Sequence, residues 1–375
     1  GVDTDMHILF LTDNFPPEGN APATRTFEHA REWVGKGQKV TVITCAPNFP
    51  DGKVFQGYRN KWLSKQRIEG IDVWRVKTYI SANEGFIKRT IDFLSFMLSS
   101  LFFGIFIRKV DVVIGTSPQF FTVISAWTLA KFKQVPFVFE LRDIWPASIT
   151  AVGAMRRSWI INFLEKLEFF LYGQADLIIS VTHSFKLELQ NRGVSADKVK
   201  VVLNGVDLSR YKPLPEKDKA FSEEFQLQGK FVAGYVGTHG LAHALDTIIK
   251  AAELLKAVDD IRIVFVGGGA DRARLEKLVE ARDLSNVVMI PRQPKENMPK
   301  IWSLCDVSVV SLRDTPLFST VIPSKIFECM AMKLPIIISV PEGESTEIVR
   351  RERIGLVVPP ENPARLAEAL INIKD

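Results

Sequence analysis

The side chains best arranged for chemistry lie between Pro323 and Glu328, in the sequence PSKIFE. A helix is expected to begin at Ser324, because serine is a favoured capping residue. Lys325 then falls in the first turn, where a cation is unfavourable unless a bound anion reverses the local charge. Glu328 lies one turn further on the same face, where its carboxylate could accept hydrogen bonds from both hydroxyls of a nucleotide ribose. The alternative is an exposed lysine–glutamate pair that stabilises the helix by a few tenths of a kcal/mol.

A second candidate follows the first expected strand, in the sequence DNFPPEGNAPATRTF (13–27). Gly19 and Asn20 precede a helix, and a helix that begins behind a glycine-containing loop binds anions through its free N–H groups and its dipole. A diphosphate is the anion we expect. The loop lacks the GxGxxG pattern of dinucleotide-binding folds, and a plain βα loop is the alternative interpretation. Arg25, in the first turn of this helix, could face the site or the solvent.

A third polar group stands at the end of the expected strand 136–141, where Arg142 and Asp143 follow the last strand residue. The carboxyl ends of parallel strands form the edge of the sheet at which ligands bind. The two residues are therefore candidates to contact a substrate. The alternative is an arginine–aspartate pair that braces the turn. Glu140 is also available at this edge, but we expect its side chain to point into the sheet.

The elements that must position these residues are predicted by the hydrophobic pattern. Apolar, β-branched runs alternate with helical patterns, which indicates parallel sheets buried on both faces. The pattern breaks near 207–230 and then restarts. We therefore predict an α/β protein of two doubly wound, Rossmann-like domains, 6–206 and 207–375, whose strand ends face a cleft. The predicted strands are 7–12, 39–44, 72–76, 111–116, 136–141, 176–181 and 199–204, then 231–237, 261–269, 287–291, 307–312, 335–340 and 354–359.

The composition of the chain excludes some classes of partner. The 375 residues carry a formal net charge of +5, which suits contact with phosphates or acidic lipids but is also common in soluble proteins. No run of lysine and arginine is dense enough for a nucleic-acid-binding arm, so we expect no nucleic acid partner. Cys45, Cys305 and Cys329 show no metal-ligand spacing and indicate a reducing, cytoplasmic compartment. Residues 1–5 resemble an expression remnant, and the strand after Met6 is no secretory signal.

One apolar segment, 91–107, has Asp92 as its only charge and is bordered by basic pairs at 88–89 and 108–109. It is slightly short for a membrane span of about 20 residues, and it runs into an expected strand. Two interpretations stay open. The segment forms a helix packed in the core, or a helix with one face in the domain and the other in a membrane interface. In the second case, the aromatic helix at 159–172 belongs to the same surface.

Several sequence segments resemble the family 4 glycosyltransferases, which have the GT-B fold. These segments follow the order and spacing of that family along nearly the whole chain. The variants RDIWP and GTHGLAH resemble the branch that assembles bacterial O-antigen and capsule, including L-fucosamine (N-acetylfucosamine) transferases. The matching segments are VLNGVD (202–207), FVAGYVGTHG (231–240), IVFVGGG (263–269), MPKIWSLCDVSVVSL (298–312), IPSKIFECMAMKLPII (322–337) and GLVVPPENPARLAEAL (355–370).

The resemblance implies that the C-terminal domain binds a nucleotide sugar, with Glu328 on the ribose and Lys325 on the diphosphate. The chain departs from the family at three positions: Thr320 replaces the first of two glutamates, Thr238 stands where arginine is common, and His243 lies near a usual lysine. Lys325, His243, helix N-termini and Arg25 must then supply the positive charge. The expected nucleotide-sugar contacts are Gly19, Asn20, Gly237, Thr238, His243, Gly267, Arg292, Thr320, Pro323, Ser324, Lys325 and Glu328.

The resemblance also implies a retaining reaction. An N-acetylated amino-deoxy sugar would pass from a UDP-sugar to a lipid-diphosphate-linked saccharide at the inner-membrane surface, in O-antigen or other polysaccharide synthesis. Fixed cations stabilise the negative charge that develops on the leaving diphosphate. The expected catalytic residues are Asp143, Arg142 and Lys325. Asp143 would position or deprotonate the acceptor hydroxyl or orient Arg142, while Arg142 or Arg25 would hold the acceptor diphosphate. No DxD motif follows Met6, so we expect neither a metal nor a cofactor.

Other protein classes share parts of this pattern. A nucleotide-sugar 2-epimerase of GT-B fold has the same scaffold, but the chain does not match its His/Glu/Asp pattern. An epimerase would also release the nucleotide without an acceptor. A non-enzymatic, two-domain sugar-binding protein is usually exported, whereas no export signal is visible here. An NAD-dependent dehydrogenase is disfavoured, because the glycines at 267–269 are not followed by the acidic residue that binds the ribose.

Overall fold

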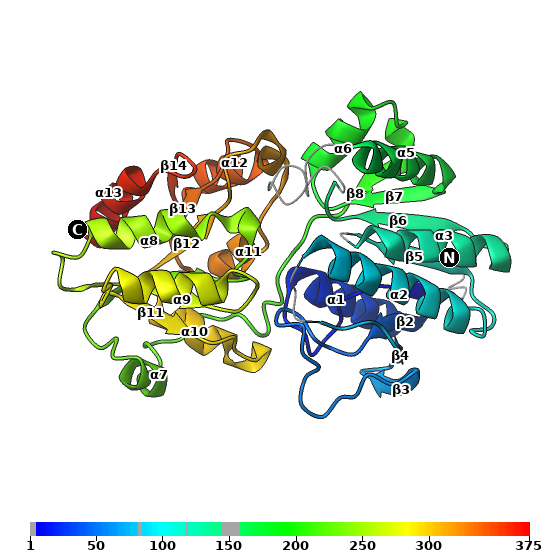
Figure 1. The fold of residues 1–375 in the computed structure, drawn as a ribbon, viewed down its shortest axis with the longest axis horizontal. Helices are drawn as coiled ribbons and strands as arrows, with labels where there is room; N and C mark the ends of the chain where they lie inside the picture. The colour runs from blue at the N-terminus through cyan, green and yellow to red at the C-terminus, as the bar shows by residue number, and fades with distance from the viewer. Residues whose placement is uncertain (1–4, 82–84, 118, 145–157) are drawn as a thin grey trace. The chain divides into compact units, whose positions relative to one another are not determined.

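The computed structural model describes residues 5–81, 85–117, 119–144 and 158–375. The chain divides into two compact units, Gly1–Leu203 and Asn204–Asp375 (Figure 1). Trp145 and Pro146 of the RDIWP motif lie outside the described residues, as do the first four residues of the expected expression remnant.

Within its described residues, the first unit forms an eight-stranded sheet in the order β3-β4-β2-β1-β5-β6-β7-β8. Neighbouring strands are parallel, except that β3 pairs antiparallel with β4. The order reverses between β1 and β5, the type of position at which such sheets bind ligands. The strands are β1 (His7–Leu11), β2 (Lys39–Cys45), β3 (Leu63–Ile68), β4 (Ile71–Val76), β5 (Val112–Thr116), β6 (Phe137–Leu141), β7 (Leu177–Ser180) and β8 (Val199–Val201).

Helices cover this first sheet. Phe10 on β1 meets Trp33 on α1, with ring centroids 6.1 Å apart, in a core cluster of apolar side chains from the central strands. Burial on both faces explains why these strands are continuous apolar runs rather than alternating ones. The helices are α1 (Ala21–Gly35), α2 (Phe86–Gly104), α3 (Phe120–Lys133), α5 (Trp159–Gln174) and α6 (His183–Asn191), with the 3-10 turn η1 (Ala196–Lys198).

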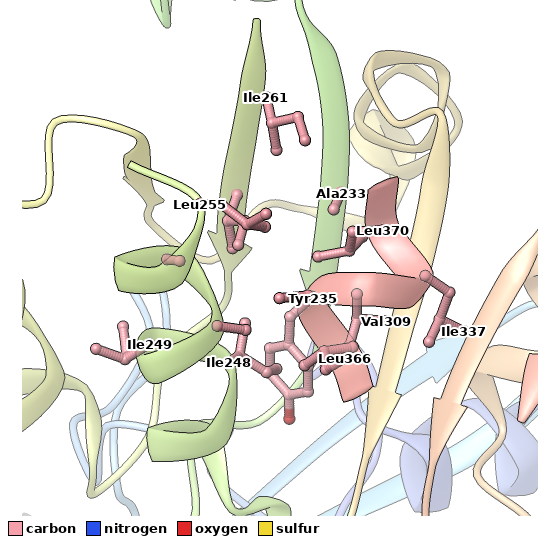
Figure 2. Close-up of a cluster of buried hydrophobic side chains, with 14 of the residues drawn as sticks. Ala233, Tyr235, Ile248, Ile249, Leu255, Ile261, Val309, Ile337, Leu366 and Leu370 are labelled. Atoms are coloured by element: carbon pink, nitrogen blue, oxygen red, sulfur yellow. The ribbon is translucent and has the colours of Figure 1, made fainter. Parts of the chain in front are cut away.

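The second unit forms a six-stranded parallel sheet in the order β11-β10-β9-β12-β13-β14. Its order reverses between β9 and β12. Figure 2 shows part of the core, where Tyr235 of β9 lies among side chains of two helices, including Ile248 and Leu366. The strands are β9 (Phe231–Val236), β10 (Ile261–Val266), β11 (Val287–Ile290), β12 (Val307–Ser311), β13 (Ile336–Ser339) and β14 (Gly355–Val358).

The helices of the second unit are shorter than most of those in the first. They are α7 (Lys219–Glu224), α8 (Leu245–Leu254), α9 (Arg272–Ala281), α10 (Met298–Leu304), α11 (Lys325–Ala331), α12 (Glu344–Arg351) and α13 (Pro363–Lys374), with the 3-10 turns η2 (Leu241–His243), η3 (Lys295–Asn297) and η4 (Pro316–Thr320). The predicted α/β class with two doubly wound parallel sheets is confirmed. The hydrophobic pattern did not predict β3, α6 or α12, and the segment that contains α7 was expected to be a connection.

The apolar segment 91–107 belongs to α2, which combines a buried face with an exposed one. Phe96 and Ser100 are fully buried, and the Ser100 hydroxyl lies 2.8 Å from that of Ser125 on α3. The opposite face exposes Leu98 and Phe102. This helix is therefore not wholly buried in the core. None of the described helices is long and apolar enough to cross a membrane.

Candidate functional site

Glu328 on α11 is held by two side chains of the second unit. The indole Nε1 of Trp302 donates to Glu328 Oε2 at 3.1 Å, and Lys325 Nζ lies 3.5 Å from the same oxygen. Trp302 is buried on α10, whereas the Glu328 side chain keeps 13% of its surface exposed. A carboxylate fixed through one oxygen, and still partly accessible, is suited to accept hydrogen bonds from a ligand.

The start of α11 differs from the expected capping arrangement. The helix begins at Lys325, but the Ser324 side chain makes no capping hydrogen bond. The reason is local geometry: Ser324 has helical angles, φ −65° and ψ −22°, whereas a capping serine is normally extended, so that its hydroxyl meets the free N–H groups. The Ser324 carbonyl accepts from the Phe327 N–H at 3.1 Å instead. Pro323 and Ser324 are half-buried beside Lys325.

Two glycine turns of the second unit pack backbone against backbone. Gly237 follows β9, and Gly267 follows β10 with φ +143°. A Cβ atom on Gly267 would lie 2.1 Å from the Gly237 carbonyl oxygen. The two loops are joined further by hydrogen bonds from Gly237 N to Val266 O and from His239 N to Gly268 O. This close approach requires Gly267 whether or not a ligand binds there.

Replacing Gly267 by alanine is therefore expected to destabilise the protein by about 2–3 kcal/mol, because the new methyl group meets a backbone carbonyl and the φ angle is strained. The free energy of unfolding in urea measures the effect. Gly35→Ala is the matched control: a Cβ there meets nothing within 4 Å, and we expect no loss of stability. Equal stability of Gly267→Ala and the parent would contradict the packing described here.

His239 lies inside this pair of turns and was not singled out by the sequence analysis. Its side chain is fully buried, and neither ring nitrogen has a hydrogen-bond partner among the described residues. The ring packs against Phe265 and Tyr235, with centroids 6.0 and 5.9 Å away. Burial, the charge of Arg272 and the nearby imidazole of His243 lower the pKa of His239 to about 4, so the ring is neutral at pH 7.

His243 does not supply the positive charge that we expected of it. Burial lowers its pKa to about 4, so the imidazole is uncharged at neutral pH. Its ring lies edge-on to Tyr235, and its carbonyl accepts from the Ser311 hydroxyl at 2.8 Å. Arg313 N donates to the Ala242 carbonyl at 2.9 Å. These bonds tie η2 to the end of β12, at the position where the strand order reverses.

Three other expected contacts lie on the loops of the second unit. Thr238 is half-buried, and its carbonyl accepts from the Tyr235 hydroxyl at 2.6 Å. Thr320 ends η4, where its hydroxyl donates to the Leu317 carbonyl at 2.5 Å. Arg292 is exposed just beyond β11. The structure thus joins Thr238, His243 and the glycine turns in one set of loops, and it places Lys325 and Glu328 of α11 beside Trp302 of α10.

In the first unit, Asn20 caps α1. Its side-chain oxygen accepts from the Ala23 N–H at 3.3 Å, so one of the free N–H groups expected to bind an anion is already satisfied. Gly19 is exposed in the preceding loop. Glu18, next to it, is buried, and its carboxylate accepts from the backbone N–H groups of Phe15, Asn48 and Phe49. This glutamate fixes the shape of the loop.

Arg25 and Arg142 meet at a buried carboxylate, that of Glu140. Arg25 Nε is 3.4 Å from Glu140 Oε2, and Arg142 Nη1 is 4.0 Å from Oε1. Glu140 and Arg25 are both buried, so Arg25 does not face solvent, and the sequence pattern did not predict that the two residues pair. Burial lowers the pKa of Arg142 to about 10, and the charge of Asp143, which is half-buried next in the chain, acts in the opposite direction.

In the described part of the chain, no group of three or more His, Cys, Asp or Glu side chains is placed to hold a metal ion.

Two family models match the chain. The model described as Glycosyltransferase Family 4 matches residues 23–210, and the one described as Glycosyl transferases group 1 matches residues 216–375. Among curated proteins, WcaI of Escherichia coli (strain K12), described as a colanic acid biosynthesis glycosyl transferase, is 25% identical over 87% of this chain and 81% of its own length. WbjE of Pseudomonas aeruginosa, described as a glycosyltransferase, is 24% identical over 71% of this chain and 66% of its own length.

Solved structures of GT-B glycosyltransferases share the fold. Anabaena HepE, in complex with UDP and glucose, superposes with a TM-score of 0.71 at 15% identity and covers 99% of this chain and 90% of its own. WaaG, a glycosyltransferase involved in lipopolysaccharide biosynthesis, has a TM-score of 0.68 at 12% identity, with 98% and 90% covered. At such low identities the likeness establishes the GT-B fold, as predicted, and not the substrates.

Proposed function

The chain belongs to glycosyltransferase family 4, and we propose that it transfers a sugar, with retention, from a UDP-sugar to a lipid-diphosphate-linked saccharide. The product would enter a bacterial polysaccharide, such as O-antigen. An N-acetylated amino-deoxy sugar, of the fucosamine type, is the donor sugar that we propose. The observation that carries the proposal is the Glu328 carboxylate, held by Trp302 and Lys325 on the second unit.

The donor side of the proposal rests on the chemistry of this carboxylate. Lys325 and Trp302 both approach Oε2, so Oε1 stays available for a ribose hydroxyl. Lys325 is itself 27% exposed, and a lysine that keeps some access can contact a phosphate as well as its glutamate. The choice of UDP is supported by the neighbour HepE, whose structure contains UDP.

The chemical step follows from where charge develops. As the bond between the anomeric carbon and the diphosphate breaks, negative charge grows on the leaving oxygen, and fixed positive groups lower the barrier. Lys325 is our candidate on the donor side. His239 and His243 are neutral at pH 7, so they could donate hydrogen bonds but add no charge. We propose that Asp143 positions the acceptor hydroxyl and that the departing phosphate takes its proton. No metal is needed for these steps.

The acceptor side of the proposal rests on an apolar surface of the first unit. The exposed apolar residues of α2 recur at spacings of three and four, so they form one stripe. The helix α3 packs against both α2 and α5, and Trp127 of α3 meets Phe170 of α5 with ring centroids 5.3 Å apart. The exposed members of this apolar surface are Ile87, Ile91, Leu94, Leu98, Phe102, Ile105 and Phe106 with Phe132, Trp159, Phe163, Phe169 and Phe170.

Basic residues border this apolar surface. Lys88, Arg108, Lys109 and Lys131 are exposed near the ends of α2 and α3. An apolar helix face with basic neighbours is typical of helices that lie in the interface of a membrane containing anionic lipid. We propose that the surface docks on the cytoplasmic side of such a membrane, where a lipid-linked acceptor is presented. The three cysteines are free and buried, which suits a reducing compartment.

Sugar transfer is tested by an assay of nucleotide release. With a panel of UDP-sugars and lipid-linked saccharides, we expect UDP to form only when donor and acceptor are both present, and to form equally in EDTA. The anomeric configuration of the product, measured by NMR, should match that of the donor. Release of UDP without an acceptor at the same rate, or an inverted product, would contradict the proposal.

A further inference from the structure

The first unit contains a buried cluster of charges that the donor site does not explain. The side chains of Arg25 and Glu140 are each 3% exposed, and that of Arg142 is 6% exposed. The Glu140 carboxylate lies between the two guanidinium groups and also accepts from the Thr116 hydroxyl at 2.9 Å. Buried ionic groups are costly unless each is well paired, so the partners of each group matter.

Glu140 is well paired. Burial alone would raise the pKa of its carboxyl, but the charges of Arg25 and Arg142, with the hydrogen bond from Thr116, outweigh that effect and hold the pKa below its usual value. His29, on α1, is kept uncharged by burial and by the two arginines, which lower its pKa. Asp143 is the other acidic group that acts on Arg142. Among the residues that the structure describes, the groups facing Arg142 at neutral pH are therefore one arginine, two carboxylates and a neutral histidine.

Arg142 is incompletely paired. Its Nε and Nη1 atoms are buried and have no hydrogen-bond partner in the described part of the chain. Nη1 is 4.0 Å from Glu140, which is too long for a hydrogen bond. A guanidinium carries five N–H donors, and buried donors are almost always satisfied in folded proteins. The missing partner must be an acceptor, and it must suit a planar cation.

The position of Arg142 shows where that acceptor would come from. Arg142 follows the last residue of β6, and its backbone N–H is fixed at 2.9 Å by the Ser117 hydroxyl at the end of β5. This is the carboxyl edge of the sheet, next to the strand at which the order reverses, where ligands of such folds bind. Arginine at such an edge favours phosphate, whose oxygens match its parallel N–H groups.

We propose that Arg142 is a binding residue for a phosphate group of a substrate diphosphate, with Glu140 and Arg25 as positioning residues that hold its guanidinium in place. The inference rests on the proposed function, which supplies two diphosphates: that of the nucleotide sugar and that of the lipid-linked acceptor. The ion pair with Glu140 orients the Arg142 guanidinium before the ligand binds.

The test measures binding of inorganic pyrophosphate to the full chain by calorimetry, in the parent and in the Arg142→Met and Arg142→Lys variants. We expect Arg142→Met to weaken binding by about 10-fold or more. Arg142→Lys keeps the charge but not the planar fork and should lie in between. Arg67→Met, an exposed arginine of the same unit, is the matched control and should bind like the parent. If Arg142→Met does not fold, Arg142→Lys decides the test.

Two further measurements identify the source of the phosphate. A matching loss of UDP affinity assigns Arg142 to the donor diphosphate. Unchanged UDP affinity with a raised KM for a diphosphate-linked acceptor, but not for the same saccharide on an alkyl chain, assigns it to the acceptor. Parent-like affinities and KM in a folded Arg142→Lys or Arg142→Met variant would overturn the inference while leaving the proposed function intact. If the parent transfers no sugar, and the Arg142→Met variant no longer binds pyrophosphate, only the proposed function is contradicted.

Discussion

Replacing Glu328 by alanine is expected to weaken UDP binding by about 10- to 150-fold, the range for loss of hydrogen bonds to a charged group. The carboxylate is partly exposed and is fixed by Trp302 and Lys325, so it binds a ribose hydroxyl without first having to be ordered. Turnover should fall with the affinity, because the nucleotide anchors the reacting sugar. Isothermal calorimetry with UDP and a steady-state transfer assay measure the two effects.

The control for this experiment is Glu280→Ala, which removes an exposed glutamate from α9 of the same unit. It should bind UDP like the parent. A sharper comparison uses deoxy-UDP analogues that lack one ribose hydroxyl. The parent should prefer UDP to at least one of them, and Glu328→Ala should lose that preference. Unchanged UDP affinity in a folded Glu328→Ala variant would remove the main support for the proposed donor site.

The substitution Trp302→Phe removes the hydrogen bond that Trp302 donates to the Glu328 carboxylate. Trp302 is buried and donates to Glu328, so we expect it to affect the ligand through this carboxylate. Loss of one such bond weakens UDP binding by an expected factor of about 3–10. A purely structural role would lower thermal stability but leave the ratio of UDP to deoxy-UDP affinity unchanged, whereas a positioning role lowers that ratio.

The fold could be predicted from the sequence because its strands are buried on both faces. A run such as FVAGYV in β9 has to be apolar throughout, and its ends are marked by glycine. The elements that were missed lack this signal. The edge strand β3, LSKQRI, has no fully buried residue, so its sequence shows no continuous apolar run. The helix α12, ESTEIVRR, is mostly polar and only eight residues long.

The candidate site could be predicted only in part, because local pattern identifies residues and not their partners. PSKIFE indicated that Lys325 and Glu328 share a face, and the structure pairs them at 3.5 Å. The hydrogen bond from Trp302 joins residues 26 positions apart, and no helical or strand spacing specifies it. The same holds for Arg25 and Glu140, far apart in the chain. His243 was assigned a charge because the sequence does not show the desolvation that lowers the pKa of its imidazole.

The second large effect is expected on α2, where the change Leu98→Glu with Phe102→Glu should release the protein from vesicles that contain anionic phospholipid. The two side chains are 62% and 58% exposed, one turn apart on the apolar stripe. Each loses about 2 kcal/mol of apolar burial in the lipid, and each new carboxylate is repelled by the anionic surface. Together these effects predict a loss of vesicle affinity of about 100-fold or more, measured by co-sedimentation.

The matched control is Leu254→Glu, on α8 of the second unit. The Leu254 side chain is 59% exposed, much like those of Leu98 and Phe102. It should bind vesicles like the parent. Because Leu98 and Phe102 do not face the core, the double variant should keep the parent's melting temperature and its activity toward a water-soluble acceptor. Only activity toward an acceptor embedded in vesicles should fall. If the double variant still binds vesicles, docking occurs elsewhere on the chain. If the parent protein does not bind anionic vesicles, docking through this surface is refuted.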